Sequence, residues 1–151
     1  MRSRPFRIKA LILIFLYRLL TILIYPLYRY RIMPHRLRSN KEDPQRYLEK
    51  FGFSSLAKNQ EKLIWFHAAS VGESLSLLKL IKRFKKENPT WKILITSGTR
   101  TSAEIIEKNF PNDVIHQYAP LDFICCINRF FEHWQPSVII WVESEIWPNL
   151  I

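Results

Sequence analysis

Three carboxylates stand at two points of the sequence where an apolar segment gives way to a polar one. Glu73 closes the segment AASVGE at 68–73, and Glu143 and Glu145 belong to ESEIWPN at 143–149. An acid that ends an apolar strand is costly to bury without a partner. Carboxylates that converge on one cleft can handle a sugar hydroxyl and an oxocarbenium-like centre. If these residues converge, acid–base chemistry on a sugar is one function open to them.

The surroundings of Glu73 leave two interpretations open. Ser70 and Gly72 precede it at an expected helix start, where backbone N–H groups can hold an anion. A carboxylate in the first helical turn complements the helix dipole. At a crevice it could serve instead as a general base. The segment has one glycine and matches neither a Walker loop nor GxGxxG, so nucleotide binding at this loop has little support.

Other polar and aromatic side chains fall at similar points. The segment TSGTRTSAE at 96–104 supplies hydroxyls, among them Thr99, together with Arg100. Arg100 could meet a phosphate or remain solvated. Trp147 and the proline after it could form a rigid apolar rim for a sugar face or an acyl chain, or Trp147 could pack in the core. For His67, inside an apolar strand, a core position is the favoured interpretation.

The elements that must position these residues alternate along the chain. Short apolar segments and amphipathic segments predict strands at 63–68, 93–96, 114–118 and 138–143, and helices at 73–87, 101–109 (capped by Thr101) and 122–134. This alternation predicts an α/β fold, a Rossmann-like parallel sheet with helices on both faces. In the strand order 3-2-1-4 the loops after the first and fourth strands face each other across a ligand crevice. We therefore expect the carboxyl groups of Glu73 and Glu143 within roughly 10 Å of each other.

Charge divides the chain into a basic arm and a nearly neutral remainder. The net charge is +10, and residues 1–39 hold nine Lys or Arg and no acid. Residues 40–151 hold fourteen basic and thirteen acidic residues. A nucleic-acid-binding domain would carry its charge on the fold, whereas a basic arm fits an anionic membrane surface. We expect an anchor arm at 1–38, a linker with one short helix at 39–60, and the α/β domain at 61–151.

The depth of the arm in a membrane is left open by its sequence. The apolar run at 10–28 has the length of a membrane helix but is interrupted by Arg18. Arg18, Thr21, Tyr25 and Arg29 fall on one helical face, as in a helix that lies in the interface. A buried core helix is a third interpretation. The adjacent Cys125 and Cys126 form neither an unstrained disulfide nor a metal-ligand spacing, which favours a reducing compartment.

Four segments of the chain resemble, in order and spacing, the N-terminal half of the 3-deoxy-D-manno-octulosonic acid (Kdo) transferases. They are HAASVGE at 67–73, ILITSGTRTSAE at 93–104, HQYAPLD at 116–122, and the stretch from Pro136 through VESEIWPNLI at 142–151. The opening YRLL, with its apolar run and following arginines, is similar too. The family pattern TPTG is here TRTS, with Arg100 and Ser102 in place of a proline and a glycine.

The resemblance implies the N-terminal domain of a GT-B glycosyltransferase at the cytoplasmic face of the inner membrane. The donor would be CMP-Kdo and the acceptor a lipid A precursor, lipid IVA, with no cofactor, metal or nucleic acid. Glu73 corresponds to the proton acceptor and Glu143 to a stabiliser of the transition state. The substrate-binding candidates are Ser70, Gly72, Thr99, Arg100, Glu145 and Trp147.

Length sets this chain apart from that family, whose members are more than twice as long. Their second domain supplies most groups that bind CMP, and we expect this chain to be a truncated half that lacks them. It could then be one half of a split enzyme, with a separately encoded C-terminal partner. Alternatively, it could be a non-catalytic, membrane-bound remnant that holds the lipid A precursor.

Overall fold

The computed structural model describes residues 4–57, 61–142 and 147–150. A four-stranded parallel sheet in the order β3-β2-β1-β4 forms its centre. The prediction of the strand order is confirmed. The strands are β1 (Leu63–His67), β2 (Lys92–Ser97), β3 (Val114–Tyr118) and β4 (Val138–Trp141), and the helices between them are α3 (Val71–Glu87), α4 (Arg100–Asn109) and α5 (Ile124–Trp134).

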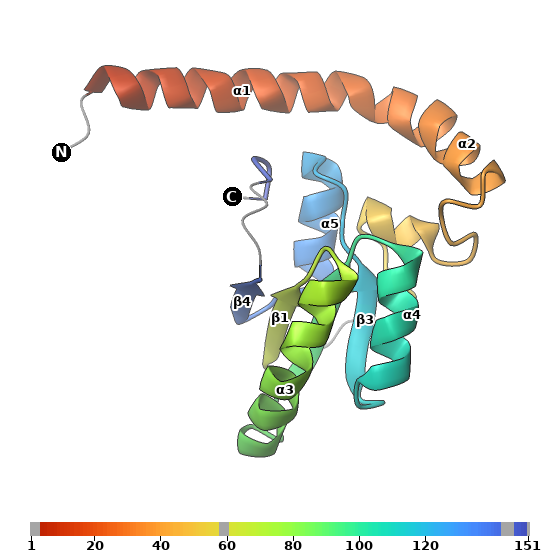
Figure 1. Cartoon of the computed structure of the whole chain (residues 1–151). Helices are drawn as coiled ribbons and strands as arrows, with labels where there is room; N and C mark the ends of the chain where they lie inside the picture. Colours follow the sequence, from red (N-terminus) through yellow and green to blue (C-terminus); the bar gives the residue numbers. More distant parts are fainter. Residues whose placement is uncertain (1–3, 58–60, 143–146, 151) are drawn as a thin grey trace.

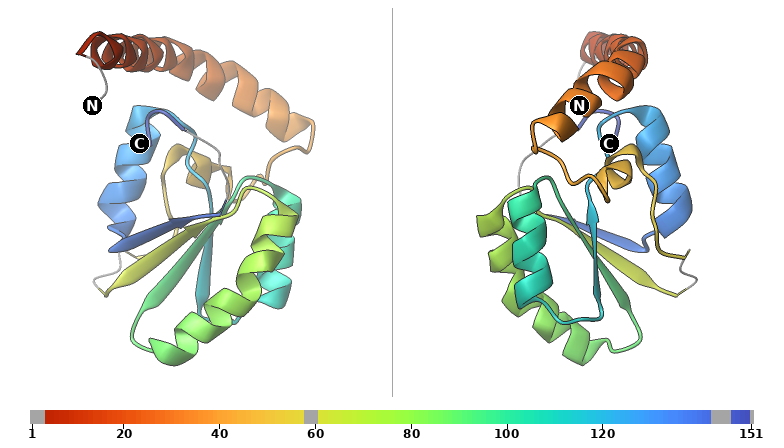
Figure 2. Two further views of the ribbon diagram at one scale, coloured as in Figure 1. Left: turned by 60° about the vertical axis from the view of Figure 1, so that its left-hand side comes forward. Right: turned by 90° about the vertical axis from the view of Figure 1, so that its right-hand side faces the viewer.

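Helices cover both faces of the sheet, as predicted, with α3 and α4 on one face and α5 on the other (Figure 2). Successive side chains of a strand point to opposite faces. Along β1, Ile64 and Phe66 accordingly pack in the core beneath α3 and α4, while Leu63 and Trp65 pack against Phe130 and Trp134 of α5. Two apolar cores therefore hold the sheet between its helices.

Two helix starts differ in detail from the prediction. Helix α4 begins at Arg100, and the side chain of Thr99, not of Thr101, accepts the hydrogen bond of the Ser102 N–H. Thr99 is the residue with extended backbone, which an N-cap requires, whereas Thr101 is already helical. Helix α5 begins at Ile124, two residues after the predicted start, and ends at Trp134 as predicted, where Gln135 follows with a left-handed backbone.

The N-terminal arm is one long helical run above the sheet. It consists of α1 (Arg4–Leu27), a π-helical segment (Tyr28–Ile32) and α2 (Met33–Arg38). Figure 1 shows α1 passing over the edge of the sheet where the strands end. The carboxyl ends of the strands, where the sequence placed its candidate chemistry, therefore face this helix.

The segment between the arm and β1 packs closely on the domain. It contains the predicted short helix, a 3-10 helix at Tyr47–Phe51, which stops at Gly52. Gly52 has a φ of 82°, and a Cβ added there would lie 2.1 Å from the carbonyl oxygen of Cys126. Only glycine fits both the backbone angle and this approach to α5. The side chain of Phe51 is fully buried with Phe123 and Cys126.

Candidate active site at the carboxyl edge of the sheet

The register of the sheet places the ends of three strands together. His67, the last residue of β1, lies beside Thr96 of β2 on one side and Trp141 of β4 on the other. The loops that follow β1 and β2 lead directly into α3 and α4, so two helix N-termini point at this edge. The arrangement agrees with the crevice expected between neighbouring β1 and β4.

Glu73 and Ser70 form a capping box at the start of α3. Ser70 has extended backbone, and its Oγ accepts a hydrogen bond from the Glu73 N–H at 3.3 Å. The Glu73 carboxylate turns back, so that Oε2 accepts from the Ala69 N–H at 2.7 Å and Oε1 accepts from the Ser70 hydroxyl. Both residues therefore serve the helix start. The carboxylate is half-buried at the edge of the crevice.

Gly72 lies in the first turn of α3 and is exposed. A Cβ added there would meet no described atom within 4 Å, and its backbone has no left-handed φ. The fold itself therefore does not require a glycine at this position. The open space beside its backbone is available to a ligand.

Thr99 and Arg100, both expected in substrate binding, have contacts within the chain. The Thr99 hydroxyl caps α4 and lies 2.8 Å from the Ser102 Oγ. The Arg100 Nη1 donates to the Asn40 Oδ1 at 2.6 Å, so the guanidinium ties α4 to the segment after α2.

His67 is buried beneath the edge, as expected for a core histidine. Its Nδ1 lies 2.8 Å from the Thr96 Oγ1. Burial lowers its pKa to about 4, against an opposing contribution from the Glu73 charge. Its Nε2 is buried and has no hydrogen-bond partner in the described part of the chain. The imidazole is therefore neutral at pH 7.

Trp147 lies beside His67, the last residue of β1. Its ring centroid is 5.5 Å from that of His67 and 6.3 Å from that of Trp141. Glu143 and Glu145, which precede it, lie outside the described residues, so their expected approach to Glu73 stays a prediction. What the structure brings together at this edge is Ser70, Glu73 and Trp147.

Asn149 and Asp122 form a second polar centre that the sequence interpretation missed. The Asn149 Nδ2 donates to the Asp122 carbonyl at 2.6 Å and to the Thr21 Oγ1 at 3.3 Å. The Tyr17 hydroxyl of α1 donates to the Asp122 Oδ2 at 2.7 Å. Asp122 ends the segment APLD and Asn149 ends the segment WPN. The polar residues of these two segments were the available signal. These contacts tie α1 to the same edge of the sheet.

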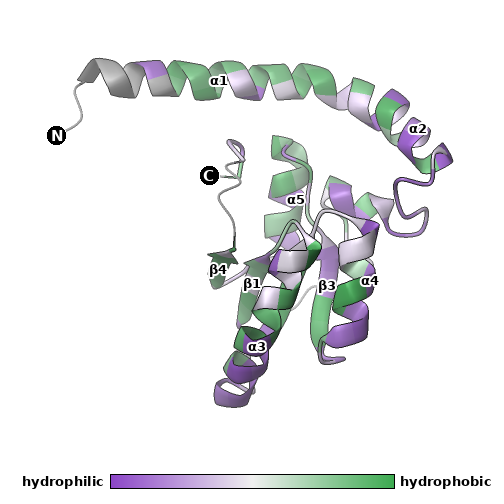
Figure 3. Cartoon of the chain, viewed as in Figure 1, coloured by the Kyte–Doolittle hydropathy of each residue, from purple (hydrophilic) through white to green (hydrophobic). Residues whose placement is uncertain are grey.

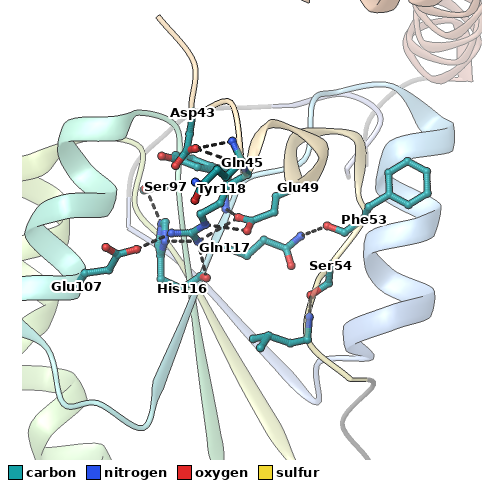
Figure 4. A network of polar contacts seen from close by, with 12 residues as sticks. Asp43, Gln45, Glu49, Phe53, Ser54, Ser97, Glu107, His116, Gln117 and Tyr118 are labelled. Atoms are coloured by element: carbon teal, nitrogen blue, oxygen red, sulfur yellow. Dashed lines mark hydrogen bonds and ion pairs between the residues drawn. The ribbon is translucent and has the colours of Figure 1, made fainter. Parts of the chain in front are cut away.

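A further charged network, also missed, closes the outer edge of β3 (Figure 4). The Arg46 guanidinium contacts Glu49 at 2.8 Å, Glu107 at 2.5 Å and the His116 Nδ1 at 2.9 Å. The Glu49 Oε2 accepts from the backbone N–H of Tyr118 at 2.8 Å. Burial, and secondarily the Arg46 charge, lowers the pKa of His116 to about 3. These groups line a cavity of about 480 Å³ and satisfy one another by direct contact, which indicates a structural role.

A buried ion pair connects α2 to the loop after β2. The Lys50 Nζ lies 2.6 Å from the Glu42 Oε2 and donates to the Gly98 carbonyl at 3.0 Å. Glu42 also pairs with the Arg36 Nε at 2.7 Å. In the described residues no three His, Cys, Asp or Glu side chains gather in a way that could hold a metal ion.

Comparison with known proteins identifies relatives of this chain. The family model described as 3-deoxy-D-manno-octulosonic-acid transferase (kdotransferase) matches residues 45–151. A probable mitochondrial 3-deoxy-D-manno-octulosonic acid transferase of Arabidopsis thaliana is 41% identical over 136 residues, which are 90% of this chain and 30% of the relative. The transferase of Rickettsia bellii is 39% identical over 136 residues, covering 90% of this chain and 32% of the relative. That of Haemophilus influenzae is 38% identical over 108 residues, covering 71% and 25%. The chain thus spans about a third of the length of the first two relatives, 30% and 32%.

Proposed function

We propose that this chain, which belongs to the Kdo transferase family, is the acceptor-side domain of an enzyme that transfers Kdo from CMP-Kdo to a lipid A precursor. The observation that carries the proposal is the half-buried Glu73 carboxylate, held at the carboxyl edge of the sheet by the Ala69 N–H and near enough to His67 for its charge to act on that imidazole. The relatives are named as Kdo transferases, and they extend well beyond the part that this chain covers. We assign the donor site to that further part.

The proposed reaction gives Glu73 the role of general base. The acceptor hydroxyl would take the place of the Ser70 hydroxyl at Glu73 Oε1, while the Ala69 N–H holds Oε2 in position. The acceptor oxygen then bonds to the anomeric carbon of Kdo, and the bond from that carbon to the phosphate oxygen breaks. CMP leaves with the bonding electrons, and the hydroxyl proton passes to Glu73. As proposed, the step uses no metal or cofactor.

Other residues at the edge would position the substrates. Gly72 leaves open space beside the start of α3, where backbone N–H groups favour an anionic group of either substrate. Trp147 offers an apolar face to a sugar ring. Glu143 would stabilise the positive charge that develops at the anomeric carbon, and Glu145, Thr99 and Arg100 would contact substrate. These roles are assigned by resemblance and by position at the edge.

The location that fits this reaction is the cytoplasmic face of the inner membrane. The helix Leu11–Arg38 is long and apolar enough to cross a membrane, and only 6% of its most apolar window is buried against the rest of the chain. This composition agrees with an acceptor whose acyl chains remain in the bilayer.

A chimera tests the function. Residues 1–151 would replace the corresponding part of the Rickettsia bellii enzyme, which supplies the remaining two thirds. We expect the chimera to transfer Kdo from CMP-Kdo to lipid IVA, and the chain alone to show no transfer. A folded chimera that binds lipid IVA but forms no product would contradict the enzymatic role and favour a binding module. Adding the remaining part as a separate polypeptide would show whether a split enzyme can assemble.

A further inference from the structure

The helix α1 meets the domain through its middle, not through its end. Tyr17 donates to Asp122, and Thr21 accepts from Asn149, both at the carboxyl edge of the sheet. One turn further, Tyr25 packs edge-on against Phe123 with ring centroids 5.3 Å apart. These α1 residues recur every fourth position and therefore share one helical face. That face is polar or aromatic and is covered by the domain.

The other faces of α1 are apolar and uncovered. Leu13, Phe15 and Leu23 are 66% to 68% exposed. Figure 3 shows that most of the α1 ribbon is green, with a few white and purple residues between the hydrophobic ones. Nine basic residues and no acid between 1 and 39 accompany it. An apolar stripe with basic residues is complementary to the acyl chains and headgroups of an anionic bilayer.

A spanning orientation conflicts with the contacts at the middle of α1. About 15 Å of helix separate Tyr17 from Leu27, which is about half of a hydrocarbon core of roughly 30 Å. If α1 crossed the bilayer, Tyr17 would lie near its centre. Asp122 and Asn149, which bind Tyr17 and Thr21, would then be drawn into hydrocarbon together with the edge of the sheet. A carboxylate at that depth is costly.

We infer that α1 lies in the plane of one leaflet, with its apolar stripe among the acyl chains of an anionic bilayer and its polar face on the domain. The clamp, defined as Tyr17, Thr21, Asp122 and Asn149, then holds the carboxyl edge of the sheet at the depth of the headgroups. The orientation follows from the contacts of α1 alone. Its consequence rests on the proposed function: an acceptor presents its sugar to Glu73 without leaving the membrane.

Spin labels at three positions measure the orientation. Leu13, Leu20 and Leu27 are exposed and lie seven residues apart, hence on one face. Each would be replaced by a labelled cysteine, with Cys125 and Cys126 changed to alanine. The full chain would be bound to vesicles of phosphatidylethanolamine and phosphatidylglycerol, and label depth would be measured from accessibility to oxygen and to a polar relaxant.

An in-plane helix places all three labels at one depth, about 5–10 Å below the headgroups. In a spanning helix the depths of the three labels would differ by up to about 21 Å. That result would overturn the inference, as would labels that remain in water. None of these readouts depends on sugar transfer, so an inactive chimera would leave the orientation standing. Conversely, graded labels in an active chimera would refute only the orientation.

A matched pair of tyrosine variants tests the clamp. Tyr17→Phe removes the hydroxyl that donates to Asp122, while Tyr30→Phe alters a tyrosine that is 72% exposed on the same helical run. We expect Tyr17→Phe to raise amide hydrogen exchange at 147–150 several-fold on vesicles, and Tyr30→Phe to leave it unchanged. Equal exchange in both variants would show that the clamp does not hold the edge.

Discussion

The two helices that start at the carboxyl edge use one capping pattern with different residues. In α3, Ser70 caps the N–H of Glu73, and in α4, Thr99 caps the N–H of Ser102. In each case the side chain three positions after the cap also contacts the capping hydroxyl. That side chain is a half-buried carboxylate in α3 and a fully buried, neutral hydroxyl in α4.

The difference between these two side chains distinguishes the requirement of a helix start from the requirement of a catalytic site. Helix α4 shows that a neutral side chain suffices at this position, so the charge of Glu73 exceeds the structural requirement. The strands before the helices differ similarly, because β1 ends in the titratable His67 and its partner in β2 is Thr96. At the third position after the cap the ionisable side chain thus belongs to α3, and Ser102 of α4 is the matched neutral position.

The largest effect should come from removing the charge of Glu73. In the chimera, Glu73→Gln keeps the shape and the capping geometry but cannot accept the acceptor's proton. General-base catalysis typically contributes about 10²–10⁴-fold, and we expect kcat to fall by that factor with little change in acceptor affinity. Ser102→Ala, at the equivalent position of α4, should leave kcat within about twofold of the unmodified chimera, since no proton transfer is assigned to it.

A Glu73→Gln chimera that retained more than about a tenth of the rate would exclude the base role. In that case the carboxylate would serve the helix dipole, worth about 0.3–1 kcal/mol. The search for a base would then move to Glu145. Unfolding by urea would establish that both variants are folded.

The second effect concerns acid stability. The unfolded chain protonates His67 near pH 6.5, but burial keeps the folded side chain neutral down to about 4. Stability is therefore complete above pH 6.5 and is lost as the pH falls from 6.5 toward 4. The loss should amount to up to about 3 kcal/mol. His67→Gln should abolish this portion of the loss, as measured by urea unfolding in mild detergent between pH 7 and 4.5.

His116 gives a second, independent contribution, because its pKa is lowered to about 3. The double variant with His67→Gln and His116→Gln should consequently show the flattest dependence of stability on pH. Identical acid losses in the parent and in His67→Gln would mean that His67 is not buried neutral in solution.

The sequence predicted the elements far better than the contacts between them. Apolar periodicity is local, so the four strands, their order and the three helices of the domain could be inferred. The choice of Thr99 over Thr101 depends on one backbone angle that periodicity does not encode. The network around Arg46 and the clamp at Asn149 include pairs 60 or more positions apart, as in Arg46–Glu107 and Thr21–Asn149. One sequence can mark such residues as polar but does not show which of them pair.

A third and smaller effect compares the two capping residues. Ser70→Ala and Thr99→Val each remove an N-cap hydroxyl and should each lower the free energy of unfolding by about 1 kcal/mol. Only Ser70→Ala also frees the Glu73 carboxylate from its intrachain donor, so kcat of the chimera should change in that variant alone. A loss of rate in Thr99→Val that exceeded its loss of stability would instead place the Thr99 hydroxyl on the substrate.

The smallest effect on stability should be found at the two glycines of the edge. A Cβ at Gly72 meets no described atom within 4 Å, and one at Gly98 lies at an ordinary 3.6 Å from the Ala69 carbonyl oxygen. Gly72→Ala lies within a helix and should stabilise the chain by up to about 0.5–1 kcal/mol, since alanine loses less backbone entropy on folding. Gly98→Ala, before the helix, should be nearly neutral.

The same substitution at Gly72 tests how the acceptor approaches. If the acceptor approaches the backbone at the start of α3, the added methyl group in Gly72→Ala occupies its space, and KM for lipid IVA should rise although the protein is more stable. Thermal unfolding and acceptor titrations of the two chimeras measure the opposing changes. Unchanged KM in Gly72→Ala would mean that the acceptor does not use this open space, and Glu73 would then have to be reached from the side of Trp147.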